Sequence, residues 1–308
     1  MKPFYQPKVI AFGLFAALLG SLSSSAARAG TIFETNIGDS TVGAYTTAGT
    51  TLNAALISGL NVPTGIAVSG SDLFVANATT GTIGEYTTSG TLVNAALITG
   101  LDNPSGIALS GSDLFVANAN SNGTIGEYTT SGVPVNPTLI SGLNDPRSIA
   151  VVGGDLFVVN EGSNTIGEYT TSGLPVNPSL ISGLSTPFGI AVSGADLFVT
   201  NAAIGTVGEY TTSGATVNPA LISGLSLPEG IAVSGSDLFV VNFATNTIGE
   251  YTTSGAPVNP TLVSGLNGPQ DLALSGVPEA STWAMALAGF AALAFAGFRR
   301  ARPTATST

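Results

Sequence analysis

Residues 65–101, GIAVSGSDLFVANATTGTIGEYTTSGTLVNAALITGL, contain four short apolar segments separated by turn-forming residues. The segments are 65–70, 72–77, 82–88 and 95–101, and they are rich in Val, Ile, Thr and Phe. This composition is typical of β-strands, and the Gly, Ser, Asn and Asp between the segments favour tight turns. The stretch therefore predicts a four-stranded antiparallel sheet.

The same unit recurs along the chain, and its tyrosine marks each copy every 41 or 42 residues: Tyr45, Tyr86, Tyr128, Tyr169, Tyr210 and Tyr251. A period near 40 residues is typical of a propeller blade or a helical solenoid. Because each copy is rich in strand-forming residues, the repeat favours the propeller. We predict an all-β fold, a six-bladed β-propeller of four-stranded antiparallel blades.

The two ends of the repeat array predict how the ring closes. The segment TIFETN (31–36) aligns with the second strand of the unit, so the first copy has no first strand. The missing strand appears at the far end as DLALSG (271–276). Pairing of these N- and C-terminal strands would complete one blade and leave no open sheet edge between the first and last copies. The predicted propeller domain therefore spans residues 30–276.

The repeat also resembles a known family. The elements P-x-G-I-A-V, D-L-F-V-A-N and T-I-G-E-Y resemble the NHL-type propeller repeat, and LFVTN (197–201) is similar to the related YVTN-type repeat. The resemblance covers essentially all of residues 30–276 and implies the propeller fold. Propellers of this kind include ligand-binding scaffolds, protein-interaction platforms, lactonases and lyases, so the resemblance implies no single function.

Composition excludes several classes of function. The 308 residues include no Cys and no His, and residues 30–276 hold 17 carboxylates against one Arg and no Lys, a formal charge of −16. Nucleic-acid binding needs a basic surface and is excluded. Catalysis by a His base or a Lys nucleophile, and a zinc site, lack their residues. Carboxylate chemistry remains, no cofactor is expected, and Ca²⁺ is the cation that such a composition accommodates.

The N-terminus has the three-part pattern of a secretory signal peptide. Lys2 and Lys8 precede an apolar run over 9–22, and Ala27-Arg28-Ala29 supplies small residues before Gly30. This order of basic, apolar and small-residue regions predicts a signal peptide over residues 1–29, cleaved after Ala29.

The C-terminal region predicts a second address. Val277-Pro278-Glu279 precedes an apolar run from Trp283 to Phe298, followed by Arg299-Arg300. The run would be about 24 Å long as a helix, which is short for a membrane span. Residues 277–302 resemble the PEP-CTERM sorting signal of exosortase-processed Gram-negative proteins, with a six-residue tail (303–308) after them. Ala280 departs from the family, which usually has a second Pro there.

The resemblance implies export across the inner membrane, an exosortase-type processing enzyme as partner, and a final location at the cell surface or outside the cell. A membrane would then be contacted only through the helix 283–298, before processing. The alternative is a plain tail anchor, because a marginal span can still insert.

The repeats differ from one another mainly on one face. We define the loop face by the connections that follow the second and fourth strands of each copy, and the turn face by the connections that follow the first and third. The turn face repeats SGSD-like and TTSG-like turns. On the loop face, the residue after the Pro that precedes each first strand varies: Thr64, Ser105, Arg147, Phe188, Glu229 and Gln270.

Glu161 and Phe243, which follow second strands, vary in the same way on the loop face. Because first strands are innermost in a propeller, the residues after the prolines are expected to ring the central channel and, with Glu161 and Phe243, to form a ligand-binding surface. Drift of exposed loops is the alternative explanation.

Residues that recur in every copy are interpreted as structural. The six tyrosines are expected to pack between blades. The Asp at the turn face, such as Asp72, favours turns and, with one per blade, does not converge on a metal. The Asn that ends each second strand, such as Asn77, is expected to terminate the strand by local side-chain hydrogen bonds.

Two classes of function remain open. The first is a non-catalytic binding or structural module, a monomer that binds extracellular polysaccharide or another surface protein, consistent with the sorting signal and the missing catalytic side chains. The second is a Ca²⁺-dependent propeller enzyme such as a lactonase or polysaccharide lyase. In the second, Arg147 would stabilise developing negative charge beside Glu161 and Glu229.

Overall fold

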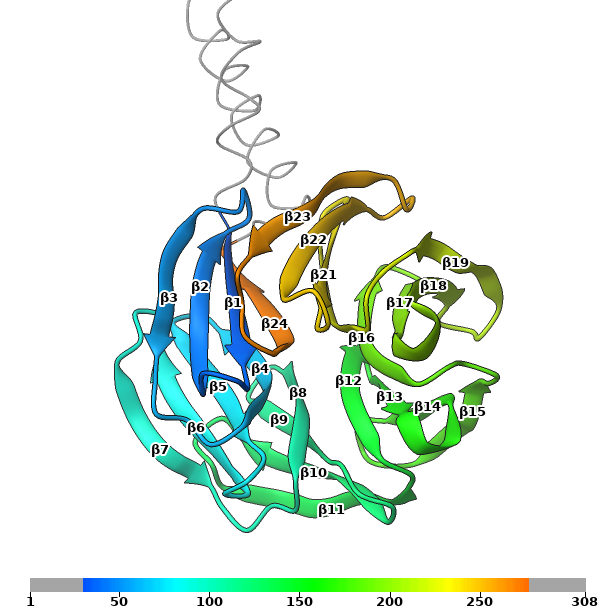
Figure 1. The fold of residues 1–308 in the computed structure, drawn as a ribbon. Helices are drawn as coiled ribbons and strands as arrows, with labels where there is room; N and C mark the ends of the chain where they lie inside the picture. Colours follow the sequence, from blue (N-terminus) through cyan, green and yellow to red (C-terminus); the bar gives the residue numbers. More distant parts are fainter. Residues whose placement is uncertain (1–29, 277–308) are drawn as a thin grey trace, which may run out of the picture.

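A computed structural model describes residues 30–276, and they form six four-stranded antiparallel sheets arranged as the blades of a ring (Figure 1). The predicted fold class is therefore confirmed. The predicted signal peptide (1–29), the sorting signal (277–302) with its helix (283–298) and the tail (303–308) lie outside the described residues. Within residues 30–276, the structure contains no helix long and apolar enough to cross a membrane.

The first strand of each blade lies on the inside of the ring. Each of these strands contacts its two counterparts in the neighbouring blades, and β24 contacts β4, so the circle is closed. The inner strands are β4 (Pro63–Ser69), β8 (Pro104–Ser110), β12 (Pro146–Val152), β16 (Pro187–Ser193), β20 (Pro228–Ser234) and β24 (Pro269–Ser275).

The other strands follow outward in sequence order. The second strands are β1 (Thr31–Asn36), β5 (Asp72–Asn77), β9 (Asp113–Asn118), β13 (Asp155–Asn160), β17 (Asp196–Asn201) and β21 (Asp237–Asn242). The third strands are β2 (Thr41–Thr46), β6 (Thr82–Thr87), β10 (Gly123–Thr129), β14 (Thr165–Thr170), β18 (Thr206–Thr211) and β22 (Thr247–Thr252). The outermost strands are β3 (Thr51–Ile57), β7 (Leu92–Ile98), β11 (Pro134–Leu143), β15 (Pro175–Ile181), β19 (Thr216–Ser223) and β23 (Pro257–Ser264). Two short 3₁₀ turns, η2 (Glu161–Ser163) and η3 (Ala202–Ile204), lie on the loop face.

One blade is assembled from both ends of the ring-forming segment. Its strand order is β24-β1-β2-β3, and β1 pairs antiparallel with β24 so that Ile32 faces Leu274. In Figure 1 the orange β24 lies beside the blue β1. The predicted closure is confirmed, and the backbone groups that an open array would expose are paired.

The predicted ends of two strands were wrong in the unit 65–101. The inner strand begins at Pro63 because Pro63 already pairs with Asn77, with a bulge before Ile66. The outer strand is Leu92–Ile98 rather than 95–101. Its exposed first half pairs with the third strand across a bulge, and Gly100, with a φ of 75°, turns the chain after the strand.

The core consists of six similar clusters, one between each pair of neighbouring blades. Each contains a Phe from a second strand, and all six of these Phe side chains are almost completely buried: Phe33, Phe74, Phe115, Phe157, Phe198 and Phe239. The six repeated tyrosines are 4–7% exposed and belong to the same clusters, as predicted. Truncating one of these Phe side chains to Ala would cost about 3–5 kcal/mol.

The asparagine that ends each second strand does more than the predicted local bonding. The Asn77 Oδ1 accepts a hydrogen bond from the Asn61 N–H at 3.2 Å, although Asn61 lies 16 residues earlier. Asn201 and Asn242 make the same contact in their blades, and in the closing blade the Asn36 Oδ1 accepts from the Asn267 N–H at 3.0 Å. In these four blades the Asn therefore fixes the two loop-face connections to each other.

Candidate functional site

The residues that follow the six prolines meet on the loop face, where the inner strands begin. Thr64, Ser105, Arg147, Phe188 and Gln270 line one cavity together with Asp271 and the glycines of the inner strands. The cavity has a volume of about 10 Å³, enough for roughly one water molecule. A larger ligand would therefore contact these side chains across the mouth of the channel rather than inside it.

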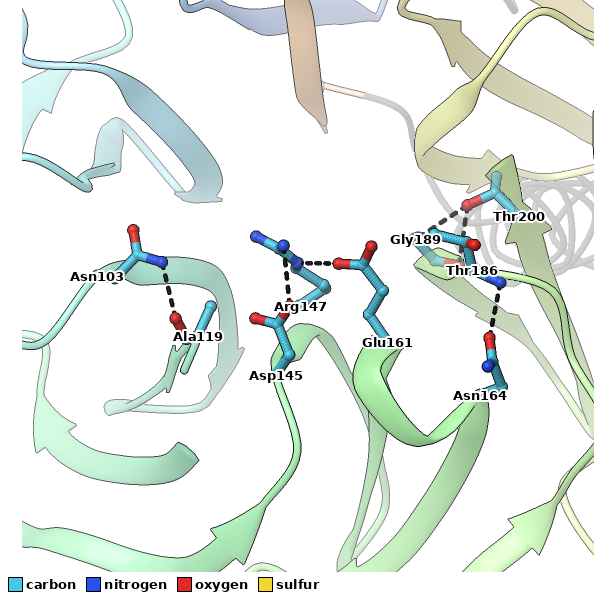
Figure 2. A network of polar contacts seen from close by, with 9 residues as sticks. All are labelled: Asn103, Ala119, Asp145, Arg147, Glu161, Asn164, Thr186, Gly189 and Thr200. Atoms are coloured by element: carbon cyan, nitrogen blue, oxygen red, sulfur yellow. Dashed lines mark hydrogen bonds and ion pairs between the residues drawn. The ribbon is translucent and has the colours of Figure 1, made fainter. Parts of the chain in front are cut away.

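Close backbone packing explains why the channel is narrow. A Cβ atom on Gly65 would overlap the backbone of Ser105, and one on Gly189 would overlap the backbone of Glu229. The Thr200 hydroxyl donates a hydrogen bond to the Glu229 carbonyl at 2.7 Å. It also accepts one from the Gly189 N–H at 2.7 Å (Figure 2). The side chains of the residues after the prolines are therefore presented from rigid strand ends.

Arg147 is the centre of a charged cluster at the mouth. Its Nε donates to Glu161 and its Nη2 to Asp145 at 3.0 Å, as Figure 2 shows. The guanidinium carbon also lies 5.6 Å from the ring centroid of Phe188. Two carboxylates therefore compensate the one positive charge, and an aromatic face covers it. The structure thus joins three predicted site residues, Arg147, Glu161 and Phe188, in one contact group.

Glu229 lies near this group without being bonded into it. Burial raises the pKa of the Glu229 carboxyl to about 8; the Arg147 charge opposes the shift, and the Glu161 and Asp271 charges add to it. Its Oε2 is buried and has no hydrogen-bond partner among the described residues. Near neutral pH this carboxyl is therefore mostly protonated, and it can donate a proton or a hydrogen bond.

Three predicted site residues do not line the cavity: Glu161, Glu229 and Phe243. Glu161 and Glu229 interact with Arg147, and the third is Phe243. It belongs to the connection between β21 and β22, and its N–H donates to the Leu227 carbonyl at 3.1 Å. The cavity lining does not include it. Phe243 is thus placed on the loop face, in the blade of β20–β23.

The sequence interpretation missed Asp271, although the repeats contained the signal. Asp271 occupies the position of Gly65, Gly106, Gly189 and Gly230 in other inner strands, so its side chain is placed in the crowded channel lining. Desolvation raises its pKa to about 6, although N–H groups of Ile66 and Leu272 stabilise the carboxylate. The Ile66 N–H donates to Oδ2 at 3.2 Å.

Glu34 was missed in the same way. It replaces a valine that the other five second strands share: Val75, Val116, Val158, Val199 and Val240. Its side chain is fully buried; Oε2 accepts from the Asn36 Nδ2 at 2.7 Å, and Oε1 has no partner within residues 30–276. Burial raises the pKa of the Glu34 carboxyl to about 8. The hydrogen bond from Asn36 lowers the pKa, and the nearby Asp39 charge raises it further.

Metal ligation was considered for the same carboxylates. Within the part of the chain that the structure describes, no three acidic side chains are arranged to hold a metal ion. The turn-face aspartates each begin the second strand of a different blade, in five of the six blades, and the closing blade has Thr31 there.

Comparisons with known proteins support the fold. No family model and no curated protein matches the chain by sequence. Among solved structures, a chain of a nidogen/laminin complex superposes with a TM-score of 0.69 at 15% identity, covering 80% of this chain and 99% of that one. A gluconolactonase from Xanthomonas campestris superposes with a TM-score of 0.57 at 16% identity, covering 67% of this chain and 78% of that one. The chain therefore shares its propeller fold with a protein found in a binding complex and with an enzyme.

Proposed function

We propose that this protein is an exported, non-catalytic binding module, a monomer whose loop face recognises extracellular polysaccharide or another surface protein. One observation carries the proposal. Among the exposed connections, changes to charged and aromatic residues occur on the loop face, whereas changes on the turn face introduce only small or aliphatic residues. Both faces are exposed, so drift through tolerant loops would have altered both.

The state of Arg147 favours binding over anion-stabilising catalysis. Because Asp145 and Glu161 both contact the guanidinium, the group as a whole is negative. Negative charge developing on a reacting substrate would be repelled there rather than stabilised. The cluster is better suited to holding the shape of the loop face and to attracting a cationic group.

A binding screen tests the proposal on residues 30–276, which contain all six interfaces of the closed ring. The ring is applied to a glycan array and to a thermal-shift panel of oligosaccharides and peptides, with and without Ca²⁺. A ligand that binds the native state raises the melting temperature. A Phe188→Ser variant should lose the shift, and the turn-face variant Ser112→Ala should keep it. Loss of the shift in both variants, or in neither, would contradict binding at the loop face.

An enzyme of the lactonase or lyase class is the second candidate, and Glu229 is the observation that favours it. A carboxyl with a pKa of about 8 at a channel mouth can act as a general acid. Turnover of lactones and uronate-containing polysaccharides, measured with and without Ca²⁺, separates the candidates. Activity abolished by Glu229→Gln would establish the enzyme and refute the non-catalytic proposal.

We also propose that residues 277–302 are a sorting address read by an exosortase-type enzyme. The supporting observations are the motif at Val277-Pro278-Glu279 and its position directly after β24, so that cleavage there would release a complete ring. Loss of the processing enzyme should leave the full-length protein in the membrane fraction. A secreted protein whose C-terminal peptide retains Arg299 and Arg300 would contradict the proposal.

A further inference from the structure

The residue before each inner-strand proline has an unusual backbone conformation. At all six positions φ is positive, between 48° and 64°: Val62, Asn103, Asp145, Thr186, Leu227 and Gly268. Gly, Asn and Asp tolerate this left-handed region, whereas β-branched and bulky side chains are disfavoured in it. Asn103, Asp145 and Gly268 therefore fit their positions, and Val62, Thr186 and Leu227 do not.

Side-chain packing does not compensate for the backbone strain at Val62 and Leu227. Val62 is 39% exposed and Leu227 is 45% exposed, so neither side chain gains much from burial. The fold accepts Asn, Asp or Gly at the equivalent positions, so it does not require an apolar residue there. Strained residues that the fold does not need are more common at binding sites than elsewhere.

Leu227 lies on a connection that is bordered by two further apolar residues, Ile204 and Phe243. The Phe243 N–H donates to the Leu227 carbonyl, and the Leu225 N–H donates to the Gly205 carbonyl at 3.0 Å, next to Ile204. Ile204 is 60% exposed. One blade earlier, the equivalents of Ile204, Leu227 and Phe243 are Ser163, Thr186 and Ala202. Ile204, Leu227 and Phe243 therefore lie on adjoining loops, and we call them the apolar strip.

Charge limits the kind of partner that fits the apolar strip. The Asp145–Arg147–Glu161 group lies at the channel mouth with a net negative charge, close to Glu229, whose carboxyl is mostly protonated near neutral pH and which follows Leu227 by two residues. Asp39 and Asp102 add negative charge to the loop face. An anionic chain would be repelled, whereas a Lys or Arg beside an apolar anchor would be attracted.

We infer that the apolar strip docks a protein segment that carries an exposed apolar or aromatic side chain next to a Lys or Arg. The anchor packs on Leu227, Ile204 and Phe243, and the basic side chain faces Asp145 and Glu161, the carboxylates around Arg147. Such a small apolar centre beside charged groups is the arrangement of a binding hot spot. The inference deepens the proposed function and rests on it.

A random linear peptide library displayed on phage tests the inference, with residues 30–276 as bait. The enriched peptides should combine an aromatic or large aliphatic residue with an adjacent Lys or Arg. One enriched peptide is then synthesised and titrated by calorimetry against the native ring and against the Leu227→Asn and Thr186→Asn rings. Leu227→Asn should weaken it about tenfold or more. Thr186→Asn, the same change at the equivalent position of the neighbouring blade, should change the affinity less than about twofold.

The Leu227→Asn ring should also melt higher than the native ring, by about 2–4 °C, because Asn tolerates the left-handed conformation. A lower melting temperature would mean that Leu227 stabilises the ring itself, and would overturn the inference. No enrichment, or enrichment of acidic or apolar-free peptides, would overturn it too. A glycan that binds Leu227→Asn and native rings equally would sustain the proposed function while refuting the apolar strip.

Discussion

The turn face and the loop face are built from connections of similar length, yet their chemistry differs. On the turn face, TTSG-like turns recur in six blades and SGSD-like turns in five, and the changes among them introduce no charged or aromatic residue: Ala48, Val152, Gly154 and Ala195. On the loop face, one position alone is occupied by Thr64, Ser105, Arg147, Phe188, Glu229 and Gln270. The six blades have the same strands but different residues at this loop-face position. The fold therefore does not require particular residues there, and their identities are better explained by binding to a partner.

The buried exceptions to the repeat also lie toward the loop face. Asp271 lines the channel mouth, and Glu34 is bonded to Asn36, which lies at the loop-face end of β1. Both belong to the closing blade and replace residues that other blades keep small or apolar. Each lowers stability at neutral pH because burial disfavours a charged carboxylate. The loop-face side of the ring thus contains both the variable surface residues and the two buried carboxyl groups, Glu34 and Asp271, that lower stability.

Placing a buried carboxyl, like that of Glu34, in a blade that has Val at this position should have the largest effect on stability. Val116→Glu places a carboxyl at the position of Glu34 in a blade where the counterpart of Asn36, Asn118, already donates its Nδ2 to the Thr124 hydroxyl at 3.0 Å. The unfolding free energy should fall by about 4–5 kcal/mol near neutral pH, because the new carboxyl is buried while the nearby amide donor is already engaged. Urea unfolding measures it, with Val116→Thr as the milder control. A loss below about 1 kcal/mol would show that any blade accepts a buried carboxyl.

The pH dependence of stability should also report the buried Glu34 carboxyl. The Glu34 pKa is raised from its ordinary value of 4.5, which the unfolded chain retains, to about 8 in the folded ring, so the folded state binds more protons between these values. Stability should therefore be highest below about pH 4.5 and decrease as pH rises through 8, by about 2–4 kcal/mol from Glu34 alone.

Glu34→Val should remove that part of the slope and leave the part from Glu229 and Asp271, whose pKa values are raised to about 8 and about 6. Asp39 and Tyr45 are the titratable groups that interact with Glu34, and both remain in the variant. Urea unfolding at pH 5 and pH 8.5 checks the expectation. Equal slopes in the two proteins would show that Glu34 is ionised in the folded ring without penalty.

Removing the positive charge of Arg147 should lower stability moderately and change the titration of Glu229. Arg147→Met leaves Asp145 and Glu161 unpaired and removes the contact with Phe188, so stability should fall by about 1 kcal/mol. The pKa of Glu229 should rise further, because Arg147 is the charge that lowers it. Carboxyl ¹³C titration by NMR follows Glu229, and Arg147→Lys should largely restore its titration. An unchanged Glu229 titration in Arg147→Met would show that the two groups are not coupled.

A turn-face substitution should have the smallest effect. Ser112→Ala converts one turn, SGSD (110–113), into the SGAD form found at 193–196. The Ser112 carbonyl, which accepts the Thr130 N–H at 2.8 Å, is retained. The unfolding free energy should change by less than about 0.5 kcal/mol. A change above about 1 kcal/mol, measured by urea unfolding, would mean that the turn face is more constrained than its chemistry indicates.

Much of the fold could be predicted because each copy of the repeat carries its own turns and strands. The number of blades and the closing pair β24–β1 both depend on local patterns that the sequence shows directly. The outer strand ends could not be predicted, because residues such as Leu92 and Asn94 are exposed and join the sheet only through a bulge beside Tyr86. Propensity alone does not indicate where such a bulge lies.

The candidate site was partly predictable for the same reason. Comparing aligned copies identified Arg147, Phe188 and Glu229 at the channel mouth. The same comparison within strands would have identified Glu34 and Asp271, since each departs from a residue shared by other copies. The backbone strain at Val62 and Leu227, the partners of Arg147 and the raised pKa of Glu229 follow from three-dimensional packing, which no pattern in the sequence displays.

Binding of the ring to cells of the producing organism, from which its gene has been deleted, tests the central claim most directly. Three fluorescently labelled rings of residues 30–276 are titrated onto washed cells: the native ring, the loop-face variant Leu227→Asn/Phe243→Ser, and the turn-face variant Ser112→Ala. We predict that the native and turn-face rings bind with the same affinity and that the loop-face variant binds at least about tenfold more weakly. Equal binding by all three rings would contradict the account.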